Sequence, residues 1–338
     1  MTELVFPRRG RGCSGPAAHA IYREQRKAFC DAILQIRSTL DFDVGSRGWA
    51  YIMEGRNVIT KFEMDICQGI VNDCRKTGEL PLDICLADEA RAFENRVDID
   101  DTTPAEEASD AMDRLLSAQR HYNPISFWDY QRCYVQMLVE KSDLRSLFSG
   151  VCKELHVPIA NAKGWGDLNM RAAMMERFKF WESKGRRCIL LYCGDFDPGG
   201  LLISDSLRSN IQDMAGAVGW DPENLDIERF GLNYDFIVEN NLTWIDNLAT
   251  SKGKYPLDDP RHNDHLQPYV QDYIAQYGVR KVEANVLVTK PEAGRALCRA
   301  AIEKYLSKDR IKKYRADLQS ARAEVREEIR RLIAEGAI

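Results

Sequence analysis

Three acidic residues stand where two strongly apolar segments end. Glu140 ends CYVQMLVE (133–140), while Asp195 and Asp197 follow the apolar run RCILLYCG in YCGDFDPGG. Such runs are typical of buried parallel strands, whose carboxyl ends meet at one edge of a sheet. Pro198 and the two glycines after it favour a turn that directs both aspartates to one point and lets a phosphate backbone approach. Carboxylate oxygens are the ligands that Mg²⁺ prefers, so the sequence predicts a magnesium site.

The segments around these acids alternate between strand and helix patterns. We expect strands at 133–140, 157–162, 187–195 and 281–287, and helices at 143–155, 167–185 and 201–214. This order predicts a parallel sheet with helices on both faces. The tail from 304 to 332 holds ten Lys/Arg, five Asp/Glu and an apolar stripe. It is typical of a docked surface helix, with a dimer coiled coil as the alternative.

The N-terminal part has a different pattern. Its first 18 residues are rich in Gly, Pro and Arg, which indicates a flexible arm or, alternatively, a basic arm that touches DNA. Helical spacing follows in 19–40 and again after Thr60, where Glu63 completes a capping box. The short segment RGWAYIME lies between these helices, and ELPLDICLA follows them as an extended piece. Three helices and a strand-like wing are the plan of a winged-helix domain.

Three motifs together resemble a known family. LVEKSDL, AKGWGDLNMRAAM (162–174) and GDFDPGGLLISD (194–205) are similar to the Toprim domain of topoisomerases, primases and some nucleases. The resemblance is closer to the A subunit of type IIB topoisomerase (topoisomerase VI) and its relatives, the meiotic double-strand-break proteins and the short stand-alone A-like proteins of mobile elements. It covers about residues 45–290 and is strongest in 133–205.

One motif of the family is altered here. The family has Gly-x-Pro-Asp followed shortly by Thr-Arg, where this chain has Gly164, Gly166, Asp167, Met170 and Arg171. Gly therefore replaces the Pro, and Met replaces the Thr.

The resemblance also draws attention to RGWAY (47–51). Members of this family carry a nucleophilic tyrosine in a winged-helix domain, as the second of two adjacent aromatic residues that follow an arginine. Here Arg47 is present, Ala50 replaces the first aromatic residue, and Tyr51 holds the second place. If 47–53 is helical, Arg47 and Tyr51 share a face, and the guanidinium can hold a phosphate and favour the phenolate. In the alternative interpretation, Tyr51 simply packs in the core.

The resemblance implies an α/β chain with an N-terminal winged-helix domain, a Toprim-type parallel β/α sheet domain and a C-terminal helix. The implied boundaries are an arm at 1–18, the winged helix at 19–96, an acidic linker and helix at 97–123, the Toprim domain at 124–303 and the helix at 304–338. It further implies a homodimer in which the tyrosine of one chain faces the acids of the other.

The sequence and the resemblance also lead to expectations about binding partners and cellular location. The implied partner is double-stranded DNA, with Lys141 and Arg171 contacting phosphates; an exposed, solubilising Lys141 is the alternative. No Gly-rich phosphate-binding loop occurs, so any ATPase is expected to be a separate B-type subunit. No apolar run is long enough for a membrane span, and ten cysteines occur without a CxxC pair. We therefore expect a cytoplasmic, nucleoid-associated protein.

The net charge of −5 does not exclude DNA, because residues 81–115 alone carry eleven acidic against three basic side chains. The expected function is Mg²⁺-dependent DNA cleavage by Tyr51, which forms a phosphotyrosine link and leads to a double-strand break or strand passage. The first alternative is a Toprim nuclease that hydrolyses DNA with metal-activated water, Tyr51 being structural. The second is a non-catalytic DNA-binding protein, against which the three acids argue.

Overall fold

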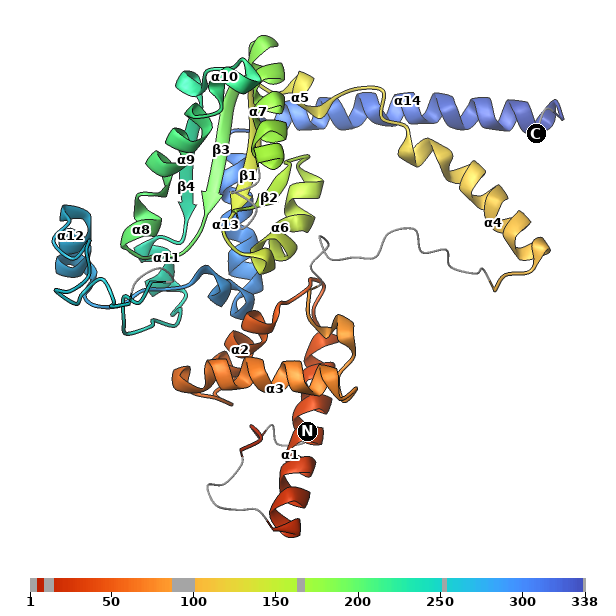
Figure 1. Ribbon diagram of the computed structural model, residues 1–338. Helices are drawn as coiled ribbons and strands as arrows, with labels where there is room; N and C mark the ends of the chain where they lie inside the picture. Colours follow the sequence, from red (N-terminus) through yellow and green to blue (C-terminus); the bar gives the residue numbers. More distant parts are fainter. Residues whose placement is uncertain (1–4, 9–14, 87–100, 163–167, 251–253, 337–338) are drawn as a thin grey trace.

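A parallel four-stranded sheet forms the core of the upper body in Figure 1, above the N-terminal helices. The computed structural model describes residues 5–8, 15–86, 101–162, 168–250 and 254–336. The strand order is β2-β1-β3-β4, and every pair is parallel. The strands are β1 (Cys133–Val139), β2 (Ile159–Asn161), β3 (Arg187–Cys193) and β4 (Asp226–Gly231). The mixed α/β fold class and the three strands predicted along 133–195 are confirmed.

Helices cover both faces of this sheet, as parallel crossovers require. On one face α6 packs with α13, and on the other α7, α9 and α10 form a second layer. These and the neighbouring helices are α6 (Ser142–Glu154), α7 (Leu168–Ser183), α8 (Pro198–Leu201), α9 (Ile203–Gln212), α10 (Ala215–Val218), η6 (Pro222–Asn224), α11 (Tyr234–Glu239), α12 (Pro268–Tyr277) and α13 (Pro291–Glu303).

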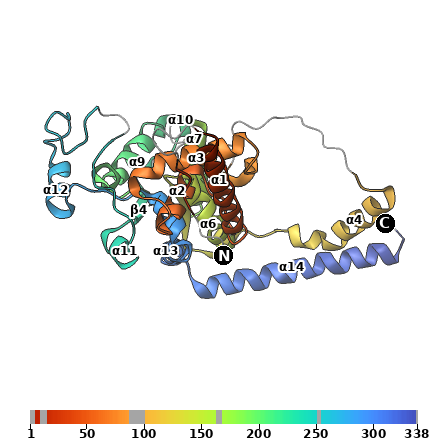
Figure 2. The ribbon, with the colours of Figure 1, turned by 90° about the horizontal axis from the view of Figure 1, so that it is seen from below.

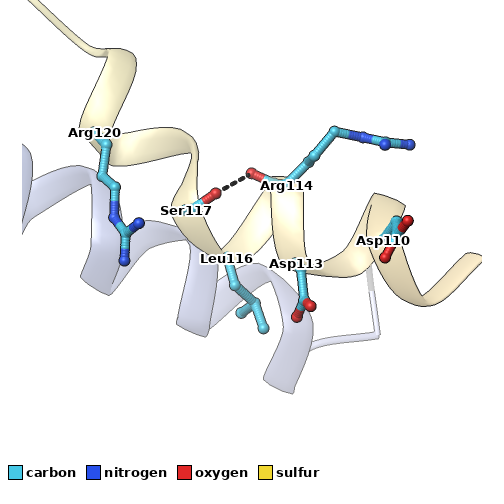
Figure 3. A pocket seen from close by; sticks show the side chains of 6 residues that line it. All are labelled: Asp110, Asp113, Arg114, Leu116, Ser117 and Arg120. Atoms are coloured by element: carbon cyan, nitrogen blue, oxygen red, sulfur yellow. Dashed lines mark hydrogen bonds between the residues drawn. The ribbon is translucent and has the colours of Figure 1, made fainter. Parts of the chain in front are cut away.

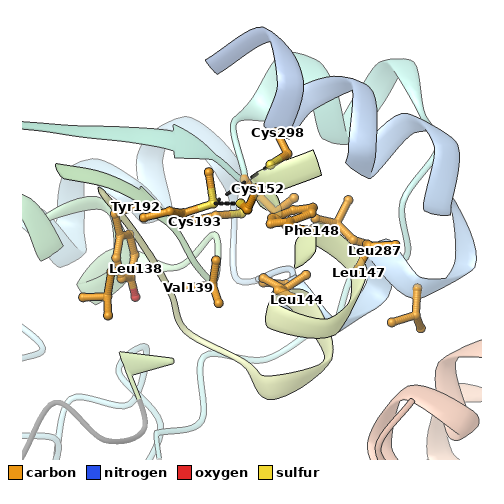
Figure 4. Packing of buried hydrophobic residues seen from close by; sticks show 14 of the residues in the cluster. Leu138, Val139, Leu144, Leu147, Phe148, Cys152, Tyr192, Cys193, Leu287 and Cys298 are labelled. Carbon is orange, nitrogen blue, oxygen red and sulfur yellow. Dashed lines mark hydrogen bonds between the residues drawn. The ribbon is translucent and has the colours of Figure 1, made fainter. Parts of the chain in front are cut away.

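The side chains of β1 alternate between the two helical layers. Met137 points toward α6 and α13, where its Sδ lies 3.8 Å from the Cys152 Sγ and 4.0 Å from the Cys298 Sγ. Gln136, next along the strand, faces the other layer and donates to the Met174 carbonyl in α7. Phe148, Cys152 and Cys298 lie together in this apolar interior (Figure 4). The strand is buried on both faces, which explains its almost continuous apolar sequence.

The N-terminal part is helical in the residues described. It comprises α1 (Pro16–Arg37), α2 (Ser46–Gly55), η1 (Lys61–Glu63), α3 (Met64–Lys76) and η2 (Leu82–Ile84). The three helices agree with the sequence prediction, but the extended wing does not, because 82–84 forms a 3₁₀ turn and no strand occurs within 5–8 or 15–86. Within the segment predicted as an arm, Phe6 is buried against Phe29, with the ring centroids 5.8 Å apart.

The prediction of a strand at 281–287 is wrong. Ala284–Thr289 forms the 3₁₀ helix η7, and only single antiparallel bridges join Val282 to Phe196 and Lys281 to Ile245. The fourth strand of the sheet is instead β4, which the sequence did not predict. Its DIERFG pattern mixes charged and apolar residues because it lies at the edge of the sheet, where one side has no strand partner.

Two helices project from this body. Figure 2 shows α14 (Lys308–Ala334) extending away with α4 (Pro104–Ser117) beside it, and η4 (Ala118–His121) and α5 (Phe127–Tyr130) connect α4 to the sheet. Leu116 and Asp113 line a cavity of about 520 Å³ on α4 and point toward α14 (Figure 3). None of the described helices is long and apolar enough to cross a membrane.

Candidate active site

The structure brings Glu140 and Asp195 together at the carboxyl edge of the sheet. β1 and β3 are adjacent and pair through Val139 and Cys193, so the residues that follow both strands are neighbours. The Glu140 Oε2 accepts a hydrogen bond from the Asp195 backbone amide at 2.8 Å. The chain leaves β1 toward β2 and leaves β3 toward β4, in opposite directions. Such a switch point opens a crevice beyond the strand ends, where ligands bind in open α/β sheets.

Lys141 lies between these two carboxylates. Its Nζ is 2.6 Å from the Glu140 Oε1 and 2.7 Å from the Asp195 Oδ2. The side chain of Lys141 is 26% exposed, that of Glu140 29% and that of Asp195 14%, so their charges are poorly screened by water. Lys141 is therefore an internal counter-ion, not the exposed solubilising side chain that the sequence left as an alternative.

This triad shifts the protonation of its members. Burial raises the pKa of Asp195, and the neighbouring Glu140 charge adds to the rise while Lys141 opposes it. Burial acts in the same direction on Glu140, but the Lys141 charge and the hydrogen bonds from Lys141 and Asp195 together outweigh it and lower the pKa of Glu140. Burial alone would lower the pKa of Lys141, yet the two carboxylates raise it, so the ammonium stays charged. The site thus holds two acids around one cation.

Asp197 lies beside the pair but has a different contact. Its Oδ1 accepts from the Gly200 amide at 2.5 Å and so caps the short helix α8. Asp197 and Glu140 line the same cavity of about 500 Å³, together with Tyr192. Glu140 and Asp197 therefore border one cavity, whereas Glu140 and Asp195 share the Lys141 ammonium.

The turn after β3 depends on a glycine. A Cβ at Gly200 would lie 2.3 Å from the Asp195 carbonyl oxygen, which is backbone and has little freedom to move. A Cβ at the neighbouring Gly199 would meet only the Asp197 Oδ1, at an ordinary 3.7 Å. The sequence expected both glycines to shape this turn, and the steric constraint falls on Gly200.

We predict that Gly200→Ala lowers the free energy of unfolding by about 2 kcal/mol, because the turn must shift to admit the methyl group. Gly199→Ala is the matched control and should change it by less than about 0.5 kcal/mol. Urea denaturation followed by circular dichroism measures both. Equal losses in the two variants would contradict this steric account of the turn.

Arg47 and Tyr51 lie on one face of α2, one helical turn apart, as their spacing predicted. The guanidinium carbon of Arg47 is 5.9 Å from the Tyr51 ring centroid. Tyr51 is fully buried, and its hydroxyl donates to the Glu283 Oε2 at 3.1 Å. Burial raises the pKa of Tyr51, and Glu283 adds to the rise while Arg47 opposes it. In this arrangement the tyrosine is a neutral, inaccessible phenol.

Glu283 joins this pair to the acidic turn. Arg47 donates to both carboxylate oxygens of Glu283, from Nε and Nη2, each at 3.1 Å. The next residue, Ala284, donates its backbone amide to the Asp195 Oδ1 at 2.8 Å. Tyr51 and Asp195 of the same chain are thus linked through two consecutive residues: Glu283 binds Tyr51, and Ala284 binds Asp195. The sequence placed Glu283 in the strand expected at 281–287.

Asp143 is a further residue at this junction that the sequence motifs did not single out. It lies in the first turn of α6, is 3% exposed, and accepts from the Gly45 amide at 2.7 Å at the start of α2. A Cβ at Gly48 would lie 2.7 Å from its Oδ2, so that position also needs glycine. The only sequence signal for it was its place in LVEKSDL, because its partner Gly45 is almost a hundred residues away along the chain.

The predicted phosphate contact at Arg171 lies on α7. Its Nη1 donates to the Asn210 carbonyl at 3.2 Å, and Asn210 lines the cavity shared by Glu140 and Asp197. Gly164, Gly166 and Asp167 of the same motif lie outside the described residues. Arg229, which the sequence did not suggest, donates from Nη2 to the Asp195 carbonyl at 2.9 Å. Two arginines therefore adjoin the acidic edge.

The donor set at this edge has the chemistry of a site for a hard cation. Glu140 and Asp195 offer carboxylate oxygens that already surround the Lys141 ammonium, so a positive charge is stable there. Among the described residues, however, no three His, Cys, Asp or Glu side chains are arranged as a cluster that could hold a metal ion. A divalent cation at this edge therefore requires Lys141 to move away.

Comparisons with known proteins add no relative. No family model matches the chain, and neither the curated proteins nor the solved structures contain a match. The resemblance to type IIB topoisomerase A subunits therefore rests on the sequence motifs quoted above, and the function must be argued from the residues at the sheet edge.

Proposed function

We propose that this chain is a Mg²⁺-dependent DNA-cleaving enzyme similar to the A subunit of type IIB topoisomerases, with a helical N-terminal DNA-binding domain in place of the expected winged helix and a Toprim domain. The observation that supports it most is the pairing of Glu140 and Asp195 at the switch point of a parallel sheet. The Arg47 and Tyr51 side chains adjoin the same edge through Glu283. A nucleophile, a phosphate-binding cation and metal-binding acids are the parts that such a reaction needs.

In the proposed reaction, the Tyr51 oxygen attacks a DNA phosphorus and the bond from phosphorus to the sugar 3′ oxygen breaks. The phenol loses its proton, and the leaving oxygen takes one from water. Arg47 holds the phosphate and favours the phenolate. Glu140, Asp195 and Asp197 would hold the Mg²⁺, which neutralises charge on the phosphate oxygens when bound. Arg171, near the same cavity, orients the DNA backbone.

The DNA is proposed to lie on the Arg47 side of the junction, not on α3. The first turns of α3 expose Asp65 and Ile66, and Phe62 just before them is 95% exposed. An acidic and apolar surface is a poor match for phosphates. A homodimer, and a separate ATPase subunit to control any strand passage, are parts of the same proposal.

One observation favours a second function. Tyr51 is fully buried, and its pKa is raised, both of which are expected of a structural tyrosine. Under this alternative, the acids at the sheet edge support hydrolysis of DNA by metal-activated water, without a covalent intermediate. DNA binding without catalysis is the third possibility.

A plasmid assay separates these functions. Supercoiled DNA and Mg²⁺ are incubated with wild type, Asp195→Ala, Tyr51→Phe and Tyr122→Phe, the last being an exposed tyrosine. We expect Asp195→Ala and Tyr51→Phe to lose cleavage, and Tyr122→Phe to keep it. Wild-type protein should stay covalently attached to DNA after denaturation. Full cleavage by Tyr51→Phe, with Asp195→Ala inactive, would establish hydrolysis instead. A wild type that binds but never cuts DNA would leave the binding function.

A further inference from the structure

Glu283 is held by the two side chains proposed for catalysis, Arg47 and Tyr51. It is 19% exposed and accepts two hydrogen bonds from Arg47 and one from Tyr51. Paired hydrogen bonds from a guanidinium are also the geometry with which arginine binds a phosphate. The Glu283 carboxylate thus binds the Arg47 guanidinium as a DNA phosphate would.

The backbone around Glu283 is fixed to the acidic turn. Phe196, between the two aspartates, exchanges two backbone hydrogen bonds with Val282, at 2.8 and 3.0 Å. On the other side of Glu283, the Ala284 amide donates to the Asp195 carboxylate. A movement of Asp195 or Phe196 is therefore transmitted to Glu283, because both of its neighbours are bound to them.

These contacts also keep α2 closed over the edge. Tyr51 is fully buried, so DNA reaches its hydroxyl only after α2 moves. The other carboxylate on Arg47 is Asp65, whose side chain is 88% exposed and which contributes little to holding the helix. Glu283 thus provides the main polar link between the α2 face that carries Arg47 and Tyr51 and the turn that carries Asp195 and Asp197.

We infer that Glu283 is a positioning residue that holds Arg47 and Tyr51 in a closed arrangement, and that a DNA phosphate opens it by replacing the Glu283 carboxylate on Arg47. This inference rests on the proposed function for the identity of the anion, but the closed contact itself does not. A change at Asp195, such as the arrival of a ligand, is therefore coupled to the release of α2 through the backbone of residues 282–284.

Two variants test the closed contact without DNA. Glu283→Gln removes the charge that binds Arg47, and Arg47→Gln breaks the same contact without altering the turn. Hydrogen–deuterium exchange of residues 46–55 should become about tenfold faster in each, because the helix opens more often. Glu292→Gln, an acid that is 86% exposed, is the control and should exchange like wild type. Wild-type exchange of 46–55 in both variants would overturn the inference.

DNA affinity, measured without divalent ions on a labelled duplex, tests the competition with phosphate. Glu283→Gln should bind about threefold to tenfold more tightly than wild type, since Arg47 no longer pairs with the Glu283 charge. Arg47→Gln should bind more weakly, and the double variant should lose the gain. A gain that persists in the double variant would overturn the phosphate competition. Faster exchange with no DNA binding in any variant would reject the proposed function alone, whereas cleavage with unchanged exchange would reject only the role of Glu283.

Discussion

Replacing Lys141 by methionine should destabilise the protein by about 3 kcal/mol when no divalent cation is present. The Lys141 ammonium is the counter-ion of both Glu140 and Asp195, and all three side chains are less than one third exposed. Removing one member of a buried charge cluster costs about 3–5 kcal/mol, because the remaining charges are left without a partner. Methionine keeps most of the length of the lysine side chain, so the loss reports charge more than packing.

The same substitution should strengthen cation binding. Under the proposed function, Mg²⁺ must displace the ammonium in the wild type, whereas in the variant the two acids are unpaired, and we expect at least about tenfold tighter binding. Thermal unfolding in EDTA and in millimolar Mg²⁺ measures both effects. Mg²⁺ should raise the midpoint of Lys141→Met far more than that of the wild type.

Lys76→Met is the control for this experiment. It removes an ammonium that is 75% exposed and paired with Asp73 on the surface, where such a pair contributes little. Its midpoint should follow that of the wild type in both solutions. If Mg²⁺ raised the unfolding midpoints of all three proteins equally, the Lys141 ammonium would not fill the position that Mg²⁺ takes between Glu140 and Asp195.

The central strands and their acids could be predicted because local pattern and chain order suffice for them. An apolar run buried on both faces identifies β1 and β3, and an acid at the end of each run is placed at the sheet edge by strand direction alone. The helical spacing of Arg47 and Tyr51 likewise needs only the period of a helix. The proximity of Glu140 to Asp195 follows from these local facts and one pairing.

The contacts that join the two parts of the chain were not predictable in this way. Glu283 was assigned to a strand because its neighbours are apolar and β-branched. In the structure, Val282 forms only a single bridge to Phe196, and Val286 is buried in the 3₁₀ helix η7. Its partners Arg47 and Tyr51 are more than two hundred residues away. No periodicity carries information over such a separation, so the burial of Tyr51 was only an alternative.

Asp143 shows the same limit and leads to the second large effect. Its buried carboxylate accepts from the amides of Gly45 and Gly48, which are unpaired donors at the start of α2. Asp143→Ala should lower the free energy of unfolding by about 3 kcal/mol, because a helix cap is lost and the amides of Gly45 and Gly48 lose their acceptor. Asp143→Asn keeps one acceptor oxygen and should lose less. Urea denaturation measures both variants.

The pH dependence of this loss distinguishes the charge of Asp143 from its hydrogen bonds. Burial raises the pKa of Asp143, although the two glycine amides oppose the rise. A folded-state pKa above the unfolded one means that the native protein holds this proton more tightly, so the contribution of Asp143 is greatest at low pH and is lost as pH rises through the raised pKa. The difference in stability between wild type and Asp143→Asn should therefore shrink from acid to neutral pH. A difference that grows instead would show that the amides outweigh burial, and that the carboxylate charge itself holds α2 against the sheet domain.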